Sequence, residues 1–468
     1  MCGLIGLVQE SEAPCNFRRL LSMLEHRGPD DSGCLAWSRG ALRRNPPDGQ
    51  LPERVLLGHQ RLAVLDISAH AKQPMSMEDD SIHMIYNGEV YNYKELRVEL
   101  EKAGYSFTST GDTEVVLKAW HFWGVDALTR FKGMFAIGLL DTRVERLYLS
   151  RDFFGIKPLY WTSWADGLGF ASEINPLMEL RGAANRLDGQ AVYDYLQFGV
   201  TDIGNRTLIE QINHVPPGHW MSIDVNTLDI EAPKRYWKLS PQNLCLSREE
   251  AVAKVRELFL DNVRLHLRSD VPLGAALSGG IDSSALVCGM RHLYPDLPIQ
   301  TFSFIADDAA LTEERWVDTV AKDVNSTSHK IRIDADDLWR DLPTLVKRQG
   351  EPFGSTSIYA QARVFQAAKE AGIKVMIDGQ GGDELFAGYQ SFRASRIADL
   401  VARLRLASGA RLFRQSCVGS GLSWRTLGQF VGMYLLSEPL RRHARAHLRG
   451  GRGRVDRERE EPPRTRDR

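Results

Sequence analysis

The amino-acid sequence predicts two successive folds: an α+β layered domain over residues 1–240, then an α/β domain with a doubly wound parallel sheet over residues 241–400. Many short apolar runs broken by turns indicate strands in the first part. In the second part strands and helices alternate, which is the order of a parallel sheet with crossover helices. Residues 401–468 predict a helical remnant and a disordered Arg-rich tail.

The predicted strands of the first part are brief. They cover residues 4–8, 55–57, 82–86, 134–140, 147–150 and 169–171, with helices at 93–103 and 114–122. Polar side chains gather where these elements end. Arg61 follows one strand, Asn87 and Gly88 end another, and Asp112 caps a helix.

The second part opens with a long amphipathic helix, which Ser247 and Glu250 begin in a capping-box pattern. The strands that follow are expected at residues 273–277, 300–304, 329–332 and 374–378, and the helices at 281–293, 313–323 and 359–371. Parallel sheets bind ligands beyond the carboxyl ends of their strands. The segment LSGGIDSS and the loop after Ile377 both fall at such ends.

The bulk composition argues against several protein classes. The chain has 468 residues, of which 43% are hydrophobic and 25% charged, and a net charge of −1, so nothing global indicates a nucleic-acid or membrane partner. No apolar stretch is long enough to span a membrane, and no signal-peptide pattern is present. The six cysteines lack a CxxC pair, which favours reduced thiols in a cytoplasmic enzyme. The Arg-rich end fits a nucleic-acid tail or a frameshifted or truncated reading frame.

The segment LSGGIDSS predicts an anion cradle between a strand and a helix. Gly279 and Gly280 let backbone N–H groups approach phosphate oxygens, and the following helix adds its dipole. Asp282 suits Mg²⁺ bridging to phosphates. The lysine of a Walker P-loop is missing. The alternative is an ordinary Gly-rich turn between a strand and a helix.

Cys2 is a candidate nucleophile. Removal of Met1 would place its thiol beside a free α-amino group with a pKa of about 7.7–8.0. That amine is able to act as the general base for its own side chain. The alternative is an incidental cysteine.

Polar clusters in the first part suit an amino-acid substrate. Arg61 would pair with a carboxylate, and Glu89 with Asp112 would hold an ammonium group. Asn87 and Gly88 would supply an oxyanion hole for attack on an amide. The alternatives are a hairpin turn at Asn87-Gly88 and a helix cap at Asp112.

A second Gly-rich loop, DGQGGDELFAGY, follows the strand that ends at Asp378. Its glycines allow close approach to a ligand, and Asp383 would supply a second metal-binding carboxylate. The alternative is a Gly-rich loop with a capping acid.

Together these motifs resemble the glutamine-dependent asparagine synthetases of the asparagine synthase superfamily. The likeness runs from Cys2 to about Tyr389, through the MCGL start and the motifs HRGPD, GHQRLAVLD, YNGEVYNY, GDTEV, RDFFGIKPLY, LSGGIDSS and GQGGDELFAGY. It implies a class II glutamine amidotransferase domain with the αββα N-terminal-nucleophile hydrolase fold, followed by an ATP-pyrophosphatase domain. It also implies glutamine, aspartate and ATP as substrates and Mg²⁺ as cofactor, with a homodimer left open.

The resemblance also implies roles for individual residues. Cys2 would be the glutaminase nucleophile, and Asn87 with Gly88 the oxyanion hole. Glutamine would be bound by Arg61, Leu62, Ala63, Val64, Leu65, Asn87, Gly88, Glu89 and Asp112. ATP would be bound by Leu277, Ser278, Gly279, Gly280, Asp282, Ser283, Phe304, Asp378 and Gly379, and Mg²⁺ by Asp282 and Asp383.

Two departures from the family pattern bear on the acceptor. The family's acyl-adenylate site carries Glu where this chain has Gln380, and Gln is not a base. The later SLExRxPFLD-type segment and pyrophosphate-binding Lys are not found, as in a C-terminally truncated form. The sequence therefore leaves three readings: an asparagine synthetase, a relative that amidates another carboxylate such as a sugar or peptide acid, and a glutaminase or regulatory protein without synthesis.

Overall fold

The computed structural model describes residues 1–10, 16–38, 41–46, 54–201, 204–240, 244–308, 312–419, 423–436 and 440. The chain forms two compact units, Met1–Asp378 and Gly379–Arg468. The predicted Arg-rich tail lies outside the described residues.

The first unit begins with two antiparallel sheets. One has the strand order β11-β9-β10-β1-β4-β2-β3, and the other β13-β12-β8-β7-β6-β5. The strands of the first sheet are β1 (Gly3–Gln9), β2 (Asp31–Ser38), β3 (Ala41–Arg44), β4 (Val55–Arg61), β9 (Tyr160–Trp164), β10 (Gly167–Ala171) and β11 (Asn213–His214). Those of the second are β5 (Met75–Ser76), β6 (Ile82–Val90), β7 (Gly133–Asp141), β8 (Arg146–Arg151), β12 (His219–Asp224) and β13 (Lys234–Arg235).

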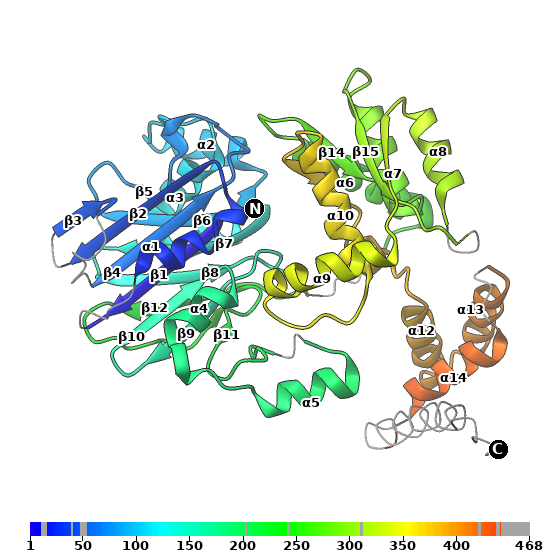
Figure 1. Ribbon diagram of the computed structural model, residues 1–468. Coiled ribbons are helices and arrows are strands. Elements are labelled where there is room, and N and C mark those ends of the chain that lie inside the picture. Colours follow the sequence, from blue (N-terminus) through cyan, green and yellow to red (C-terminus); the bar gives the residue numbers. More distant parts are fainter. Residues whose placement is uncertain are drawn as a thin grey trace, which may run out of the picture. The chain divides into compact units, whose positions relative to one another are not determined.

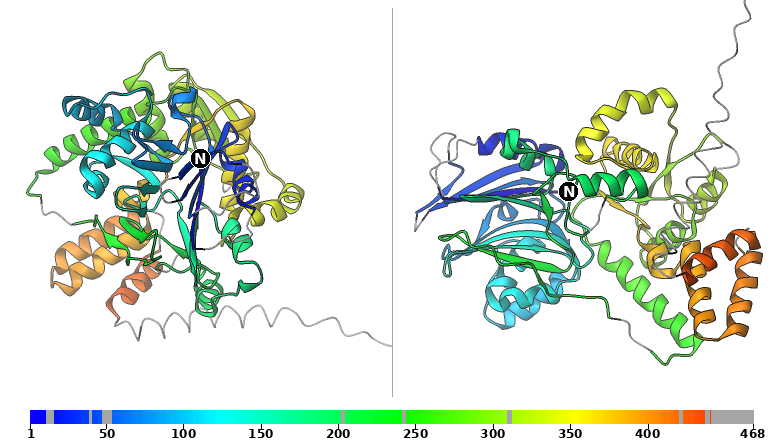
Figure 2. Two further views of the ribbon diagram at one scale, coloured as in Figure 1. Left: turned by 90° about the vertical axis from the view of Figure 1, so that its left-hand side faces the viewer. Right: turned by 90° about the horizontal axis from the view of Figure 1, so that it is seen from below.

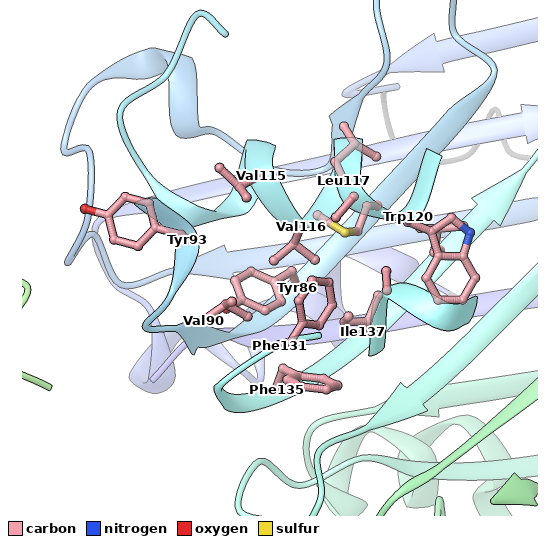
Figure 3. Packing of buried hydrophobic residues seen from close by; sticks show 14 of the residues in the cluster. Tyr86, Val90, Tyr93, Val115, Val116, Leu117, Trp120, Phe131, Phe135 and Ile137 are labelled. Atoms are coloured by element: carbon pink, nitrogen blue, oxygen red, sulfur yellow. The ribbon is translucent and has the colours of Figure 1, made fainter. Parts of the chain in front are cut away.

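Helices cover the outer faces of both sheets, so the layers are αββα (Figures 1 and 2). Apolar side chains of both sheets, such as Leu4 and Ile85, fill the space between them. Helices α1 (Phe17–Ser22) and α4 (Ile174–Arg181) pack on the first sheet. Helices α2 (Tyr93–Lys102) and α3 (Asp112–Trp123) pack on the second, around the cluster of buried hydrophobic residues in Figure 3. This is the arrangement that the resemblance predicts.

A parallel sheet follows, with the strand order β16-β15-β14-β17. Its strands are β14 (Leu273–Ala276), β15 (Gln300–Phe304), β16 (Thr327–Ile331) and β17 (Val375–Ile377). Helices α6 (Arg248–His266), α7 (Ile281–Leu293) and α8 (Glu314–Asp323) share one apolar cluster with it, and α10 (Ser357–Glu370) packs on another. The doubly wound α/β prediction is confirmed.

The second unit is helical. Its elements are α11 (Gly382–Phe386), α12 (Gln390–Ala402), α13 (Leu406–Gly419) and α14 (Trp424–Leu435). Helices α12 and α14 pack through Ala394, Ile397 and Leu427. In the described part of the chain, no helix is both long and apolar enough to cross a membrane.

Three local predictions need correction. Asn87, Gly88 and Glu89 lie inside β6, opposite β7, so they form neither a strand end nor a hairpin turn. Asp112 is the first residue of α3 and not its cap, because Gly111 takes that place and the Asp112 carboxylate binds other groups. Arg61 is the last residue of β4 and does not follow the strand. Helices α5 (Gly189–Phe198) and α9 (Ala335–Gln349) were not predicted.

Candidate functional site

The thiol of Cys2 lies against the loop that follows β4. Cys2 Sγ is 3.4 Å from the N of Leu62, which donates to it, and 3.7 Å from the carbonyl O of Leu62. Arg27 Nε donates to the Cys2 carbonyl at 3.0 Å, and Arg27 is itself held by Glu173. Cys2, directly before β1, is thus hydrogen-bonded both to Arg27 of the HRGPD motif and to Leu62 of the GHQRL motif.

The pKa of the Cys2 thiol lies below that of an ordinary cysteine. Burial raises the pKa of the thiol, but the His59 ring, the terminal amino group and the N–H of Leu62 bring it down to about 7. Burial lowers the pKa of the Met1 amino group to about 5. A thiol with this pKa is about half ionised at neutral pH, and the thiolate is the reactive form of a cysteine.

The loop from Arg61 to Ser68 is folded around the Arg61 guanidinium. Arg61 donates to the carbonyl O of Ser68 at 3.0 Å and to that of Asp66. Asp66, at a positive φ of 46°, accepts hydrogen bonds from the N–H groups of Ser68 and Thr110. An Arg guanidinium is a group that pairs well with a carboxylate.

Strand β6 carries two candidate hydrogen-bond donors for a ligand, the first of which is the backbone N–H of Gly88. In the pair Gly88–Phe135 the N and O of Phe135 bond to Asp152, so Gly88 N–H points away from β7. The neighbouring N–H groups on that side, those of Tyr86 and Val90, bond to Gln73 and Asp112.

Asn87 carries the second donor. Its side chain is 1% exposed, and its Nδ2 has no hydrogen-bond partner among the described residues. A buried amide N–H₂ left without an acceptor costs free energy unless a ligand supplies one. The site therefore fits a developing oxyanion.

Two carboxyl groups, those of Glu89 and Asp112, lie close enough for their charges to interact. Asp112 accepts from Tyr86 Oη at 2.7 Å and from Val90 N at 2.9 Å. Burial and the nearby Asp112 charge raise the pKa of Glu89 to about 8, while Lys157 opposes this rise. Such a pair favours a cationic ligand, which would relieve the repulsion between the two charges.

The loop after β14 has the geometry of an anion cradle. Gly279 adopts a φ of +87°, and Gly280 precedes α7 without a side-chain cap. Ser278 Oγ accepts from Gly280 N at 3.2 Å, and Ser283 Oγ accepts from Ser278 N at 3.2 Å. The first N–H groups of α7 are therefore left for a ligand, as at an anion-binding helix end.

The sheet order places this loop at a topological switch point. The chain runs from β14 to β15 on one side and returns as β17 on the other. Ala275 pairs with Ile377, so the LSGG loop and Asp378 leave neighbouring strand ends. Leu277 is buried there, and Phe304 lies at the end of β15 with 40% of its surface exposed.

Two family profiles match the chain. The one described as "Glutamine amidotransferase domain" covers residues 1–237, and the one described as "Asparagine synthase" covers residues 254–465. The chain belongs to the asparagine synthase family.

Curated members of the family are similar along most of this chain. "Asparagine synthetase [glutamine-hydrolyzing] 1" of Bacillus subtilis is 33% identical over 84% of this chain and 60% of that protein. "Putative asparagine synthetase [glutamine-hydrolyzing] 2" of Methanocaldococcus jannaschii is 28% identical over 94% of this chain and 84% of that protein. "Amidase chyE" of Penicillium rubens is 30% identical over 81% of this chain and 56% of that protein. The chain thus spans about three fifths of the Bacillus relative.

A solved phosphoribosylpyrophosphate amidotransferase from B. subtilis superposes with a TM-score of 0.40 at 16% identity, covering 81% of this chain and 90% of that one. The two antiparallel sheets and the parallel sheet themselves establish the fold of this family member.

The remaining candidate residues belong to the second unit. Gly379 and Gln380 lead into the short helix α11, whose first turn carries Asp383. No group of three or more His, Cys, Asp or Glu side chains suited to a metal occurs among the described residues. The hydroxyl and carboxylate oxygens of Ser278 and Asp282 are nevertheless the donor type that Mg²⁺ prefers.

Sequence reasoning missed two buried residues near Cys2. His59 lies in GHQRL and Lys157 in RDFFGIKPLY, two motifs that carried the resemblance without a role for either side chain. Burial lowers the pKa of Lys157, and the Glu89 and Cys2 charges oppose this. Buried ionisable groups are the signal, and burial appears only in the folded chain.

Proposed function

We propose that this member of the family is a glutamine-hydrolysing asparagine synthetase, a ligase that uses ATP. It has a glutaminase domain over residues 1–240, an ATP-pyrophosphatase domain over 241–400 and a carboxyl-terminal segment over 401–468. The observation that carries the proposal is the buried amide of Asn87, whose Nδ2 has no hydrogen-bond partner in the described part of the chain, on the same strand as Glu89, whose charge interacts with the Cys2 thiol.

In the glutaminase half, Cys2 attacks the side-chain amide of glutamine. Arg61 holds the substrate carboxylate and Glu89 with Asp112 its ammonium group. Asn87 Nδ2 and Gly88 N–H stabilise the oxyanion, a type of contact that is worth about 3–4 kcal/mol per donor. Collapse releases ammonia, and water then frees glutamate from the thioester.

In the synthetase half, a carboxylate attacks the α-phosphate of ATP. The adenosine is bound by Leu277, Phe304, Asp378 and Gly379. The loop Ser278–Ser283 binds the pyrophosphate through its N–H groups and hydroxyls. Asp282, in the first turn of α7, would hold Mg²⁺, which would neutralise phosphate charge. Ammonia then displaces AMP from the acyl-adenylate and forms an amide.

Aspartate is the first candidate acceptor, because two similar proteins of Bacillus subtilis are named asparagine synthetases. A second candidate is another carboxylate. Gln380 supports it, since an amide is unable to take the proton from attacking ammonia. The similarity to proteins named amidases also supports it.

The test is an assay of the purified chain with Mg-ATP, glutamine and aspartate. We expect glutamate, pyrophosphate, AMP and asparagine in equal amounts. Pyrophosphate that depends on another acid in place of aspartate would favour the second acceptor class. Glutamate without any pyrophosphate, whichever acid is supplied, would contradict the synthetase half.

Cys2→Ala is the matched control. It should abolish glutamate formation while ammonium chloride still supports amide synthesis, because the ATP site keeps its own residues. Loss of both reactions in this variant would contradict the two-site proposal.

A further inference from the structure

The segment His266–Asp270, which runs from the last residue of α6 toward β14, contacts both parts of the proposed glutamine site. The segment belongs to the domain that would bind ATP. Its partners belong to the other domain: the loop from Arg61 to Ser68 and the residues that follow β6. We call the segment His266–Asp270 the clamp.

Asp270 holds the loop through two hydrogen bonds to its backbone. The Asp270 carboxylate accepts from the N of Asp66 at 2.8 Å, and the Asp270 N donates to the carbonyl O of Val64 at 3.1 Å. The carbonyl O of Asp66 in turn accepts from the Arg61 guanidinium. Arg61 is the residue proposed to bind the glutamine carboxylate, so Asp270 helps to fix where that carboxylate would lie.

Arg268 holds the chain just after β6. Its Nη1 donates to the carbonyl O of Tyr91, and its Nη1 and Nη2 bind the two carboxylate oxygens of Glu95 at 2.7 and 2.6 Å. The Glu95 side chain is 54% exposed, so the ion pair alone contributes little. The bond to Tyr91 matters more, and the His266 ring also lies against the Tyr91 ring, with centroids 3.8 Å apart. Tyr91 is therefore held by two residues of the clamp.

Tyr91 directly follows the residues that would bind the glutamine ammonium group. Glu89 and Val90 are the last two residues of β6, and the N of Val90 donates to the Asp112 carboxylate at 2.9 Å. A shift of Tyr91 would therefore move both groups that orient the carboxyl pair. Arg268 acts at the ammonium end of the site, and Asp270 acts at the carboxylate end.

We propose that Arg268 and Asp270 are positioning residues of the glutaminase, supplied by the domain that would bind ATP. The proposal rests on the proposed glutamine site. Each residue acts through another: Arg268 through Tyr91, and Asp270 through Asp66. The clamp thus sets the separation between the groups that bind the two charged ends of an α-amino acid. It makes the site select glutamine over amides that lack either charge.

The experiment measures how well small amides protect Cys2 of the full chain from alkylation by iodoacetamide, followed by mass spectrometry of the amino-terminal peptide. Three ligands are compared: glutamine, glutaramate, which lacks the α-ammonium group, and 4-aminobutanamide, which lacks the α-carboxylate. The variants are Arg268→Gln and Asp270→Ala. Arg264→Gln is the matched control, because Arg264 lies on the same helix and pairs only with the exposed Asp261 among the described residues.

The expected pattern is crossed. Arg268→Gln should raise the half-protecting concentration of glutamine and of 4-aminobutanamide about 5–10-fold, through the lost hydrogen bond to Tyr91, and leave that of glutaramate unchanged. Asp270→Ala should raise the values for glutamine and glutaramate and leave that of 4-aminobutanamide unchanged. Arg264→Gln should match the wild type with all three ligands.

Conservative variants guard against misfolding. Asp270→Asn retains an acceptor for the Asp66 N–H and should protect like the wild type. Arg268→Lys keeps the charge but not the planar fork, so it should lie between Arg268→Gln and the wild type. Thermal unfolding of each variant shows whether the fold is retained.

The overturning results are distinct. An equal loss of protection with all three ligands in folded variants would show a purely structural role and overturn the proposal. Unchanged protection by glutamine in both Arg268→Gln and Asp270→Ala would overturn it as well. Both results leave the glutamine site standing. If glutamine fails to protect Cys2 of the wild type, the proposed glutamine site itself is refuted, and the positioning roles fall with it.

Discussion

The carboxylate of Asp270 accepts a hydrogen bond from the backbone N of Asp66 at 2.8 Å, across 204 residues of sequence. The backbone N of Asp270 donates in turn to the carbonyl O of Val64 at 3.1 Å. The loop from Arg61 to Ser68, which is proposed to bind glutamine, is therefore hydrogen-bonded to the segment that leads into β14. A second link joins Lys374, just before β17, to Asp30, whose carboxylate also accepts from the N–H of Ala63.

We expect Asp270→Ala to weaken glutamine binding. The change leaves the Asp66 N–H without its partner, at a cost of about 1–3 kcal/mol. The loop that positions Arg61 should loosen, so KM for glutamine should rise about 5–10-fold with a smaller change in kcat. Steady-state glutaminase kinetics measure this. Asp296→Ala, at an exposed position before β15, should match the wild type. Equal KM values for both variants would contradict the role of the link.

We expect the active protein to lack Met1. The terminal amino group of the unprocessed chain is buried beside the thiol, and burial lowers its pKa to about 5. Intact-mass measurement should show the loss of one methionine, and a short amino-terminal extension should abolish glutaminase activity while ammonia-dependent synthesis persists. A fully active chain that retains Met1 would refute this expectation.

Glutaminase activity should rise with pH through about 7 and level off above 8. The reason is the pKa of the Cys2 thiol, which lies near 7, and only the thiolate attacks. The measurement is kcat/KM between pH 5.5 and 9 in the wild type. A rate that still climbs at pH 9 would show that the thiol titrates as an ordinary cysteine.

Glu89→Gln should stabilise the fold and weaken glutamine binding. Burial, with Asp112 nearby, raises the pKa of Glu89 to about 8 in the folded chain, against 4.5 for an ordinary Glu. Between these values the unfolded state binds fewer protons than the folded one, so this group makes stability fall as pH rises. Urea unfolding should therefore show a benefit of Glu89→Gln that grows from pH 5 to pH 7.5. Glu101→Gln, on the exposed face of α2, should show none. A benefit of the same size at both pH values would argue against the raised pKa.

Gly279→Ala should disable the ATP half alone. Gly279 has a φ of +87°, and an added Cβ would lie 3.1 Å from the carbonyl O of Glu313. A left-handed backbone costs an alanine about 1–2 kcal/mol, and the contact distorts the cradle further. We expect pyrophosphate release to fall at least 10-fold with glutaminase unchanged. Gly372→Ala is the control, since Gly372 has a φ of +78° with open space around its Cβ position.

The order of elements was predictable because local patterns encode it. The boundaries of α7 and β15 agree with the prediction at both ends, since apolar periodicity and a Gly-rich turn delimit each. Asn87 and Gly88 show the opposite case. Their local sequence favours a hairpin turn, but pairing with β7 extends the strand through both residues. The roles assigned to the site residues stay predictions that the variants above test.

The sequence by itself determined the fold class, the family and the residue types of both candidate sites, because motifs and periodicity are local properties of the chain. Only the tertiary structure placed the Leu62 N–H against the Cys2 thiol and bound Asp270 to the loop at Asp66. Proton affinity and loop position depend on burial and on partners far away in sequence, and these exist only once the strands have paired.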